Sequence, residues 1–316
     1  MSKPSNSKEN PEHVKVLILG AGPAGLSAAL YAARADLQPL VLTGLQLGGQ
    51  VSLTNTIENY PGFPEGVGGV ELGELFQKQA ERFGARVLFD SAQSVDLSSR
   101  PFKVVADSGE YTADTLIIST GASPNLLKIP GETNLTGRGV SYCATCDGWF
   151  FKDKKVVVVG GGDSALEEGL FLTRFATSVT IIHRRDSFRA GAILQKRAKD
   201  NPKIKVIWNT TVTDVIGEEK VESIKVKNLL TGEVDSFTTD GFFIFVGNTP
   251  NTQMFASQLD MENGYIKVND RMHTSVAGVF AAGESADARF KQVITSAGMG
   301  AAAAMEATRF LEREAG

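Results

Sequence analysis

Cysteine is almost absent from this chain of 316 residues: it has two, Cys143 and Cys146, and only three histidines. A structural zinc site needs about four protein ligands. These few cysteines and histidines do not have the sequence spacing of such ligands, which argues against a zinc site. Long apolar runs are missing too, and none approaches the ~20 residues of a membrane-spanning helix. A basic excess is also missing, since the net charge is −4. We therefore expect neither nucleic acid nor a membrane as a partner.

The residues that are plentiful indicate a globular α/β protein, since 42% are hydrophobic and 33 are glycine. The length is sufficient for two domains. The polar opening, residues 1–13, lacks an apolar signal core, so we expect a disordered tail and a cytoplasmic protein. Cytoplasmic thiols stay reduced, and a cysteine pair there is more often catalytic or metal-binding than a structural staple.

One sequence unit occurs twice, as "KVLILGAGPAGLSAALYAARA" from Lys15 and "KVVVVGGGDSALEEGLFLTRFA" from Lys155. Each copy reads as a strand, a glycine turn and a helix, and a second short strand follows at 39–43 and at 179–183. In such a turn one glycine allows the tight bend, the next lets a pyrophosphate approach the backbone, and the third position packs helix on strand. The helix N–H groups then bind the anion. The repeat therefore predicts two Rossmann-like dinucleotide-binding domains of three layers.

The second copy indicates its nucleotide. After its second strand the chain continues "HRRDSFRA", with Arg184, Arg185 and Arg189 where a carboxylate for the ribose hydroxyl usually stands. Cations at this strand end suit a 2′-phosphate, so we expect NADPH rather than NADH. A solvated basic loop is the plainer alternative. The first copy also lacks the acidic residue, and its pattern alone does not name its nucleotide.

The second domain is expected to be inserted into the first. "LIISTGA" (116–122) and "FFIFVGN" (242–248) match each other and mark two crossings between domains. The predicted first domain is 1–120 with 248–316, and the predicted NADPH domain is 121–247, which carries the cysteines. After the return, "GVFAAGESAD" predicts a buried strand, and "QVITSAGMGAAAAMEATRFLE" predicts a second phosphate or flavin platform.

The two cysteines form a C-x-x-C pair. A disulfide here closes a very short loop and contributes little chain-entropy stabilisation, so a redox dithiol is favoured over a structural bridge. Asp147 follows directly, either as a proton donor and acceptor or as a turn residue in "CDG". Three aromatic residues come next, and at least one is expected to face a cleft or a partner: Trp149, Phe150, Phe151.

The ordered motifs closely resemble those of low-molecular-weight, bacterial-type thioredoxin reductases. From about Val14 to Leu311 the chain contains "GAGPAG", "GGQ", "ENYPGF", "STGA", "CATCDG", "GGGDSA", "HRRDSFRA", "VFAAGE" and "QVITSAGMG". The resemblance implies a homodimeric enzyme in which NADPH reduces FAD, FAD reduces the Cys143–Cys146 disulfide, and the dithiol reduces thioredoxin. The discontinuous first domain would then bind FAD.

The resemblance also implies roles for single residues. Cys146 would be the sulfur beside the flavin, Cys143 would attack the thioredoxin disulfide, and Asp147 would be the acid/base. The remaining matched positions are, for FAD, Gly20, Gly22, Gly25, Gln50, Asn59, Glu284 and Gln292; for NADPH, Gly162, Ser164, Ala165, His183, Arg184, Arg185 and Arg189; for thioredoxin, Arg138, Trp149 and Phe150. Glu284 replaces an aspartate that binds the flavin's ribityl chain, and Asn248 replaces a common histidine.

Two other functions fit parts of this pattern: a flavin-dependent dithiol oxidase, and a non-catalytic redox-sensing flavoprotein. The oxidase needs no nicotinamide site, and the sensor needs neither the cysteine pair nor Asp147, so the intact motifs disfavour both. A sulfur beside a flavin cannot meet another protein. We therefore expect the NADPH domain to rotate between half-reactions, about hinges near Gly121 and Gly247.

Overall fold

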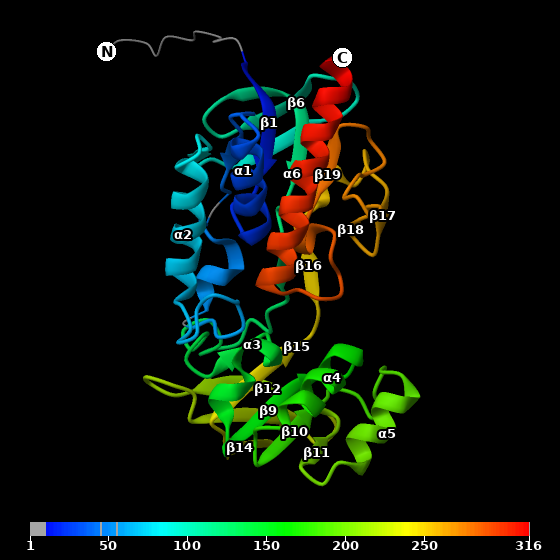
Figure 1. Cartoon of the computed structure of the whole chain (residues 1–316). Helices are drawn as coiled ribbons and strands as arrows, with labels where there is room; N and C mark the ends of the chain where they lie inside the picture. The colour runs from blue at the N-terminus through cyan, green and yellow to red at the C-terminus, as the bar shows by residue number, and fades with distance from the viewer. Residues whose placement is uncertain (1–10, 45, 55, 316) are drawn as a thin grey trace, which may run out of the picture. The chain divides into compact units, whose positions relative to one another are not determined.

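The computed structural model describes residues 11–44, 46–54 and 56–315. The chain divides into two compact units: unit 1 is Met1–Ser123 with Pro250–Gly316, and unit 2 is Pro124–Thr249 (Figure 1). The chain leaves unit 1 at 124 rather than at the expected 121, and returns at 250 rather than 248. In sequence terms, unit 2 is thus an insertion within unit 1.

The first strand begins earlier than the polar composition suggested. Residues 1–10 of the expected tail lie outside the described part of the chain. Glu12 and His13, also expected in that tail, belong instead to strand β1 (Glu12–Leu19). They pair in register with Tyr111 and Thr112, and the His13 ring lies 3.1 Å from the Thr112 hydroxyl. Ladder pairing with an existing strand outweighs the low hydrophobicity of this end.

Unit 1 is built on a seven-stranded sheet of order β3-β2-β1-β6-β5-β4, with β19 paired to β6. Strands β1, β2, β3, β6 and β19 run parallel, and β5 pairs antiparallel with both of its neighbours, β6 and β4. The bounds after β1 are Leu40–Leu42 (β2), Arg86–Leu88 (β3), Ala92–Asp96 (β4), Phe102–Ala106 (β5), Glu110–Ile118 (β6) and Val279–Ala281 (β19).

Helices α1 (Pro23–Arg34) and α6 (Val293–Ala315) cover one face of this sheet. Small residues bring the two helices close together, and a Cβ added at Gly300 would lie 1.9 Å from the carbonyl oxygen of Ala24. The other elements of unit 1 are η1 (Gly49–Leu53), α2 (Gly69–Glu81), η3 (Gln253–Phe255), β17 (Met261–Glu262), β18 (Tyr265–Ile266) and η4 (Gly283–Ser285). Where the chain crosses, β7 (Ala122–Pro124) and β16 (Asn248–Pro250) form a two-stranded sheet.

Unit 2 has a parallel five-stranded sheet of order β11-β10-β9-β15-β8 and a three-stranded antiparallel sheet, β12-β13-β14. Side chains of β9 alternate between two cores: Val156 and Val158 pack with the helices, and Val157 packs with the second sheet. The bounds are Val140–Ser141 (β8), Ala144–Asp147 (α3), Gly148–Phe151 (η2), Lys155–Gly160 (β9), Asp163–Leu172 (α4), Ser178–Ile182 (β10), Ala192–Asp200 (α5), Ile204–Ile207 (β11), Thr210–Ile216 (β12), Ser223–Asn228 (β13), Val234–Thr238 (β14) and Gly241–Phe245 (β15).

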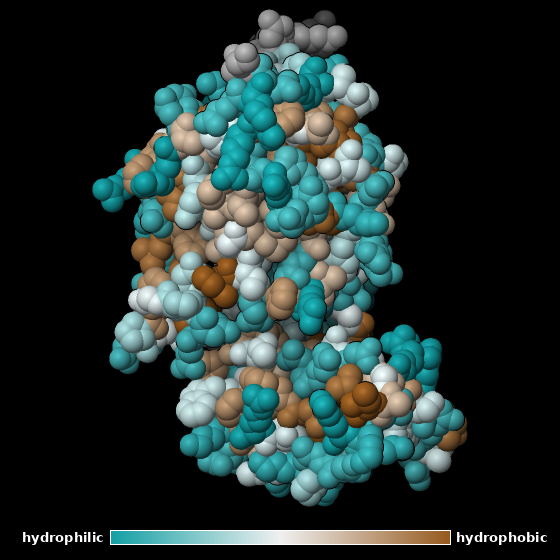
Figure 2. All heavy atoms as spheres, turned by 45° about the vertical axis from the view of Figure 1, so that its right-hand side comes forward, coloured by the Kyte–Doolittle hydropathy of each residue, from teal (hydrophilic) through white to brown (hydrophobic). Residues whose placement is uncertain are grey.

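Both units therefore have the strand–turn–helix–strand arrangement of dinucleotide-binding folds, and the predicted fold class is confirmed. On the face that Figure 2 shows, hydrophobic residues are interspersed among hydrophilic ones. Among the described residues, no helix has the length and apolar character needed to cross a membrane.

Two adjacent phenylalanines allow a direct test of the unit 2 core. Phe151 is buried, with its ring centroid 5.0 Å from that of Phe243, whereas Phe150 is 39% exposed. We expect Phe151→Ala to lower the free energy of unfolding by about 3–5 kcal/mol, because it leaves a cavity. Phe150→Ala should change it by no more than about 0.5 kcal/mol. Chemical denaturation of both variants would measure this, and equal losses would contradict the packing described.

Candidate active site

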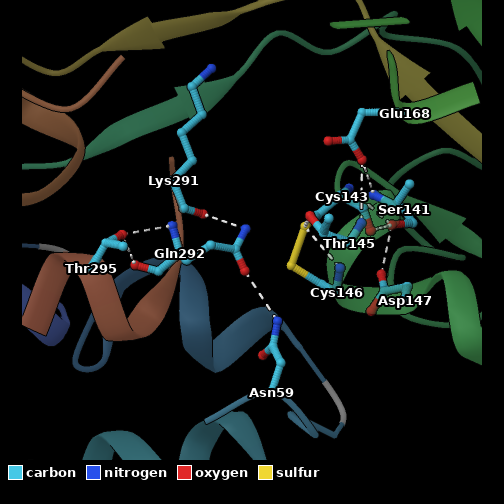
Figure 3. The surroundings of a disulfide bond; sticks show 11 residues. Asn59, Ser141, Cys143, Thr145, Cys146, Asp147, Glu168, Lys291, Gln292 and Thr295 are labelled. Atoms are coloured by element: carbon cyan, nitrogen blue, oxygen red, sulfur yellow. Dashed lines mark hydrogen bonds between the residues drawn. A yellow bond between two sulfur atoms is a disulfide. The ribbon is translucent and has the colours of Figure 1, made fainter. Parts of the chain in front are cut away.

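The cysteine pair lies where β8 leads into the short helix α3. Cys143 and Cys146 are joined in a disulfide, with their Cα atoms 5.3 Å apart (Figure 3). Cys143 caps the N-terminus of α3, and the backbone N–H of Cys146 donates to its sulfur at 3.2 Å. An N–H directed at a sulfur stabilises the thiolate that forms when the disulfide is reduced. The geometry thus supports a redox role for the pair.

Asp147 lies at the end of the same helix in a half-buried position. Its Oδ2 accepts a hydrogen bond from the Ser141 hydroxyl at 2.6 Å. Burial raises the pKa of Asp147, and the hydrogen bond from Ser141 partly opposes this rise. The carboxyl therefore keeps its proton to higher pH than an exposed aspartate, which suits a group that supplies a proton to a sulfur.

Sequence reasoning missed Ser141, the last residue of β8. Its side chain is buried, and its oxygen also accepts the backbone N–H of Cys143 at 3.1 Å. One hydroxyl thus connects the Asp147 carboxyl to the backbone of the first cysteine. The available signal was a small polar residue at the end of an apolar strand, two positions before Cys143.

Sequence reasoning also missed Glu168, on α4. One oxygen of its carboxylate accepts the backbone N–H groups of Ala144 at 2.8 Å and Thr145 at 3.3 Å (Figure 3). These are the two residues between the cysteines. An acidic residue 24 positions after Ala144 therefore contacts the segment 143–146 directly, which we call the redox segment.

The glycine turn of unit 1 has the geometry of an anion cradle. A Cβ at Gly25 would lie 1.9 Å from the carbonyl oxygen of Gly20, so glycine is required for helix α1 to approach β1. A Cβ at Gly22 would meet nothing within 4 Å. The predicted roles, with one glycine for packing and one facing open space, agree with this geometry.

Four other residues predicted to bind FAD form two pairs in unit 1. Asn59 donates to Gln292 at 3.1 Å (Figure 3). Gln50 hydrogen-bonds to Glu284, whose pKa is raised chiefly by burial. Glu284 Oε2 is buried, and no described residue provides a hydrogen-bond partner for it. A buried carboxylate oxygen without a partner is costly, which points to a ligand at this position.

The predicted NADPH residues meet at the glycine turn of unit 2. A Cβ at Gly162 would meet nothing within 4 Å, and Ala165 is buried at the start of α4. The backbone N–H of Arg189 donates to the carbonyl oxygen of Gly161 at 2.7 Å, which brings the arginine loop to the turn. The side chains exposed there are Ser164, Arg184, Arg185 and Arg189.

His183 takes a different position from these exposed residues. Its ring is buried against the turn, and a Cβ at Gly161 would lie 2.2 Å from the ring. Burial, the largest effect, lowers its pKa. This contact supports a role for His183 in packing beneath the turn. Direct contact of His183 with the nucleotide stays a prediction.

The residues predicted to bind a protein partner are exposed. Trp149 is 54% exposed, and its ring packs edge-on against Phe175 with centroids 5.7 Å apart. Phe150 and Arg138 are exposed as well, whereas Phe151 is buried. Two of the three aromatics are therefore accessible to solvent, and contact of either one with a cleft or a partner stays a prediction.

Known proteins are similar to this chain in sequence and in fold. The sequence profile of the family described as pyridine nucleotide-disulphide oxidoreductase matches residues 14–300. The chain belongs to this family. A thioredoxin reductase of Rickettsia felis is 49% identical over 305 residues, which cover 95% of this chain and 98% of the relative. One of Vibrio cholerae is 48% identical, with coverage of 96% and 99%. The crystal structure of thioredoxin reductase from Streptococcus pyogenes has a TM-score of 0.92 at 40% identity, with coverage of 96% and 100%.

The expected resemblance to bacterial-type thioredoxin reductases is thereby confirmed, and FAD and NADPH are the implied cofactors of this pyridine nucleotide-disulphide oxidoreductase. The residues present fit both groups. In unit 1, the open space at Gly22 can take a phosphate, and the orphaned Glu284 oxygen can accept from a ligand hydroxyl. In unit 2, the open space at Gly162 can take a phosphate. The arginine loop, whose Arg189 bonds to the turn at Gly161, carries the exposed positive charges that a 2′-phosphate requires.

The role of Ser141 can be tested through the ionisation of Asp147. In Ser141→Ala, Asp147 loses the hydrogen bond that opposes the effect of burial, so its pKa should rise further above that of an exposed aspartate. Infrared difference spectra of the carboxyl band, with Asp147→Asn as the reference, would give both titration midpoints. A midpoint in Ser141→Ala equal to or below that of the unsubstituted protein would contradict this account.

Proposed function

We propose that this protein is an NADPH-dependent flavoprotein disulfide reductase whose substrate is thioredoxin. The observation that carries the proposal is the Cys143–Cys146 disulfide followed by the half-buried Asp147 carboxyl, in a unit with an arginine-flanked nucleotide turn. FAD, when bound, supplies the acceptor for the hydride of NADPH and the donor of an electron pair to the disulfide.

The chain's own residues perform the exchange with the protein substrate. The Cys143 thiolate attacks one sulfur of the thioredoxin disulfide, and the other sulfur leaves as a thiolate that takes up a proton. The Cys146 thiolate then attacks Cys143, which releases the second thioredoxin thiolate and re-forms the Cys143–Cys146 bond. Two electrons thus pass from the dithiol to thioredoxin. Asp147 supplies a proton to the sulfur freed when the enzyme disulfide is reduced.

The individual binding sites are part of this proposal. FAD is held by Gly20, Gly22, Gly25, Gln50, Asn59, Glu284 and Gln292. NADPH is held by Gly162, Ser164, Ala165, His183, Arg184, Arg185 and Arg189. Thioredoxin contacts Arg138, Trp149 and Phe150, whose exposure supports this role. A homodimer, a cytoplasmic location and rotation of the NADPH domain between half-reactions complete the proposal, and each remains a prediction.

Anaerobic spectroscopy tests the proposed function. NADPH should bleach the flavin absorbance of the purified protein, and oxidised thioredoxin should restore it. Cys143→Ser and Cys146→Ser should lower thioredoxin turnover by about 10³-fold or more, because the exchange needs both sulfurs, while bleaching by NADPH persists. A preparation without flavin, or serine variants with full turnover, would refute the proposal. Bleaching by small dithiols alone would identify an oxidase.

The nucleotide preference has a separate test. Removal of one charge-assisted contact costs about 1.5–3 kcal/mol, so Arg185→Ala should raise the NADPH concentration needed for half-maximal flavin reduction about 10- to 150-fold. The value for NADH should change less than about threefold, because NADH lacks the 2′-phosphate. Arg174→Ala removes another exposed arginine of unit 2 and serves as the control. Equal losses with both nucleotides would exclude recognition of the phosphate by Arg185.

A further inference from the structure

Glu168 contacts the redox segment, but the proposed disulfide exchange gives this residue no role. Its carboxylate accepts the N–H groups of Ala144 and Thr145, at 2.8 and 3.3 Å. In Figure 3 the carboxylate faces this segment from its own helix. A carboxylate that accepts from two N–H donors is held in one orientation and keeps its charge close to them.

Those N–H groups lie where they can influence the sulfur of Cys143. Cys143 is the N-cap of α3, and its sulfur already accepts the N–H of Cys146 at 3.2 Å. Free N–H groups at the start of such a turn would add to the positive potential that favours a thiolate. Glu168 occupies two of them and adds a negative charge, and both effects oppose ionisation of a nearby thiol.

Among the described residues, the other charged groups around this turn do not provide the same contact. On α3 itself, burial raises the pKa of Asp147, which favours its neutral form. On α4, Glu167 and Asp163 are exposed, and Asp163 accepts the N–H of Gly191 instead. Strand β8 and helix η2 carry no ionisable side chain. The hydroxyl of Tyr142, between β8 and Cys143, donates to Glu132.

We propose that Glu168 is a positioning residue of the redox site, which holds the segment between the cysteines and limits ionisation of Cys143 in the reduced enzyme. This inference rests on the proposed disulfide reductase function. A pair whose reduced form is stabilised is a strong oxidant. By withholding that stabilisation, Glu168 keeps the dithiol a better electron donor to the substrate disulfide.

Alkylation of a single thiol tests this inference without NADPH or thioredoxin. In a Cys146→Ser background, Cys143 is the only thiol of the chain. The rate of its reaction with iodoacetamide, which forms a thioether and releases iodide, follows the thiolate fraction with pH. Full-length, flavin-containing protein would be compared with and without Glu168→Gln. Glu167→Gln, the adjacent residue with the same charge change, is the matched control.

We expect Glu168→Gln to lower the midpoint of the pH profile by about one unit, because the amide removes the charge. Glu167→Gln should move it by less than about 0.3 units, because that side chain is exposed and screened. Glu168→Ala also removes the acceptor of the two N–H groups, so it should lower the midpoint at least as far as Glu168→Gln. It replaces Glu168→Gln in the measurement if the glutamine variant does not retain flavin. Unchanged midpoints in both Glu168 variants, or an equal shift in Glu167→Gln, would overturn the inference. A failure of thioredoxin reduction would leave this readout intact, so the two proposals can fail separately.

Discussion

The close approach of a helix to the strand before it is the constraint on which both units depend. In unit 1 the approach requires Gly25 against the Gly20 carbonyl, and in unit 2 a Cβ at Gly160 would lie 2.5 Å from that of Ala165. With the helix held this close, the N–H groups at its start face an open space. In unit 2 the same helix continues to Glu168, so the packing that forms a nucleotide cradle also places a carboxylate against the redox segment.

Three carboxyl groups of this chain show how their surroundings decide what an acid can do. Asp147 is half-buried with one hydroxyl partner, and its raised pKa suits proton transfer. Glu284 has one buried oxygen, Oε2, that lacks a partner among the described residues, which suits a ligand contact. Glu168 accepts two backbone N–H groups, which suits control of a neighbouring thiol. Composition alone does not separate these roles.

Much of the fold could be predicted because repeated local patterns determine it. The two glycine turns, the strands that follow them and the C-x-x-C pair each occupy a short stretch of sequence. Ser141 and Glu168 escaped prediction because their roles arise from contacts across the fold: Glu168 reaches Ala144 over 24 positions. The start of β1 was placed too late, because pairing with β6, far along the chain, extends it to Glu12. The antiparallel sheet β12-β13-β14, whose exposed outer strand has weak alternation, gave no clear signal.

The hydrogen bonds around the cysteines also bear on how easily the segment changes oxidation state. Its backbone N–H groups at Cys143, Ala144 and Thr145 are bound by Ser141 and Glu168, neither of which depends on the sulfur–sulfur bond. The buried ring of Phe151 anchors the downstream end in the core. Cleavage of the covalent link therefore releases little chain entropy, since the backbone is already fixed. The backbone between Cys143 and Cys146 can therefore change oxidation state with little local rearrangement, whatever movement its domain makes as a rigid body.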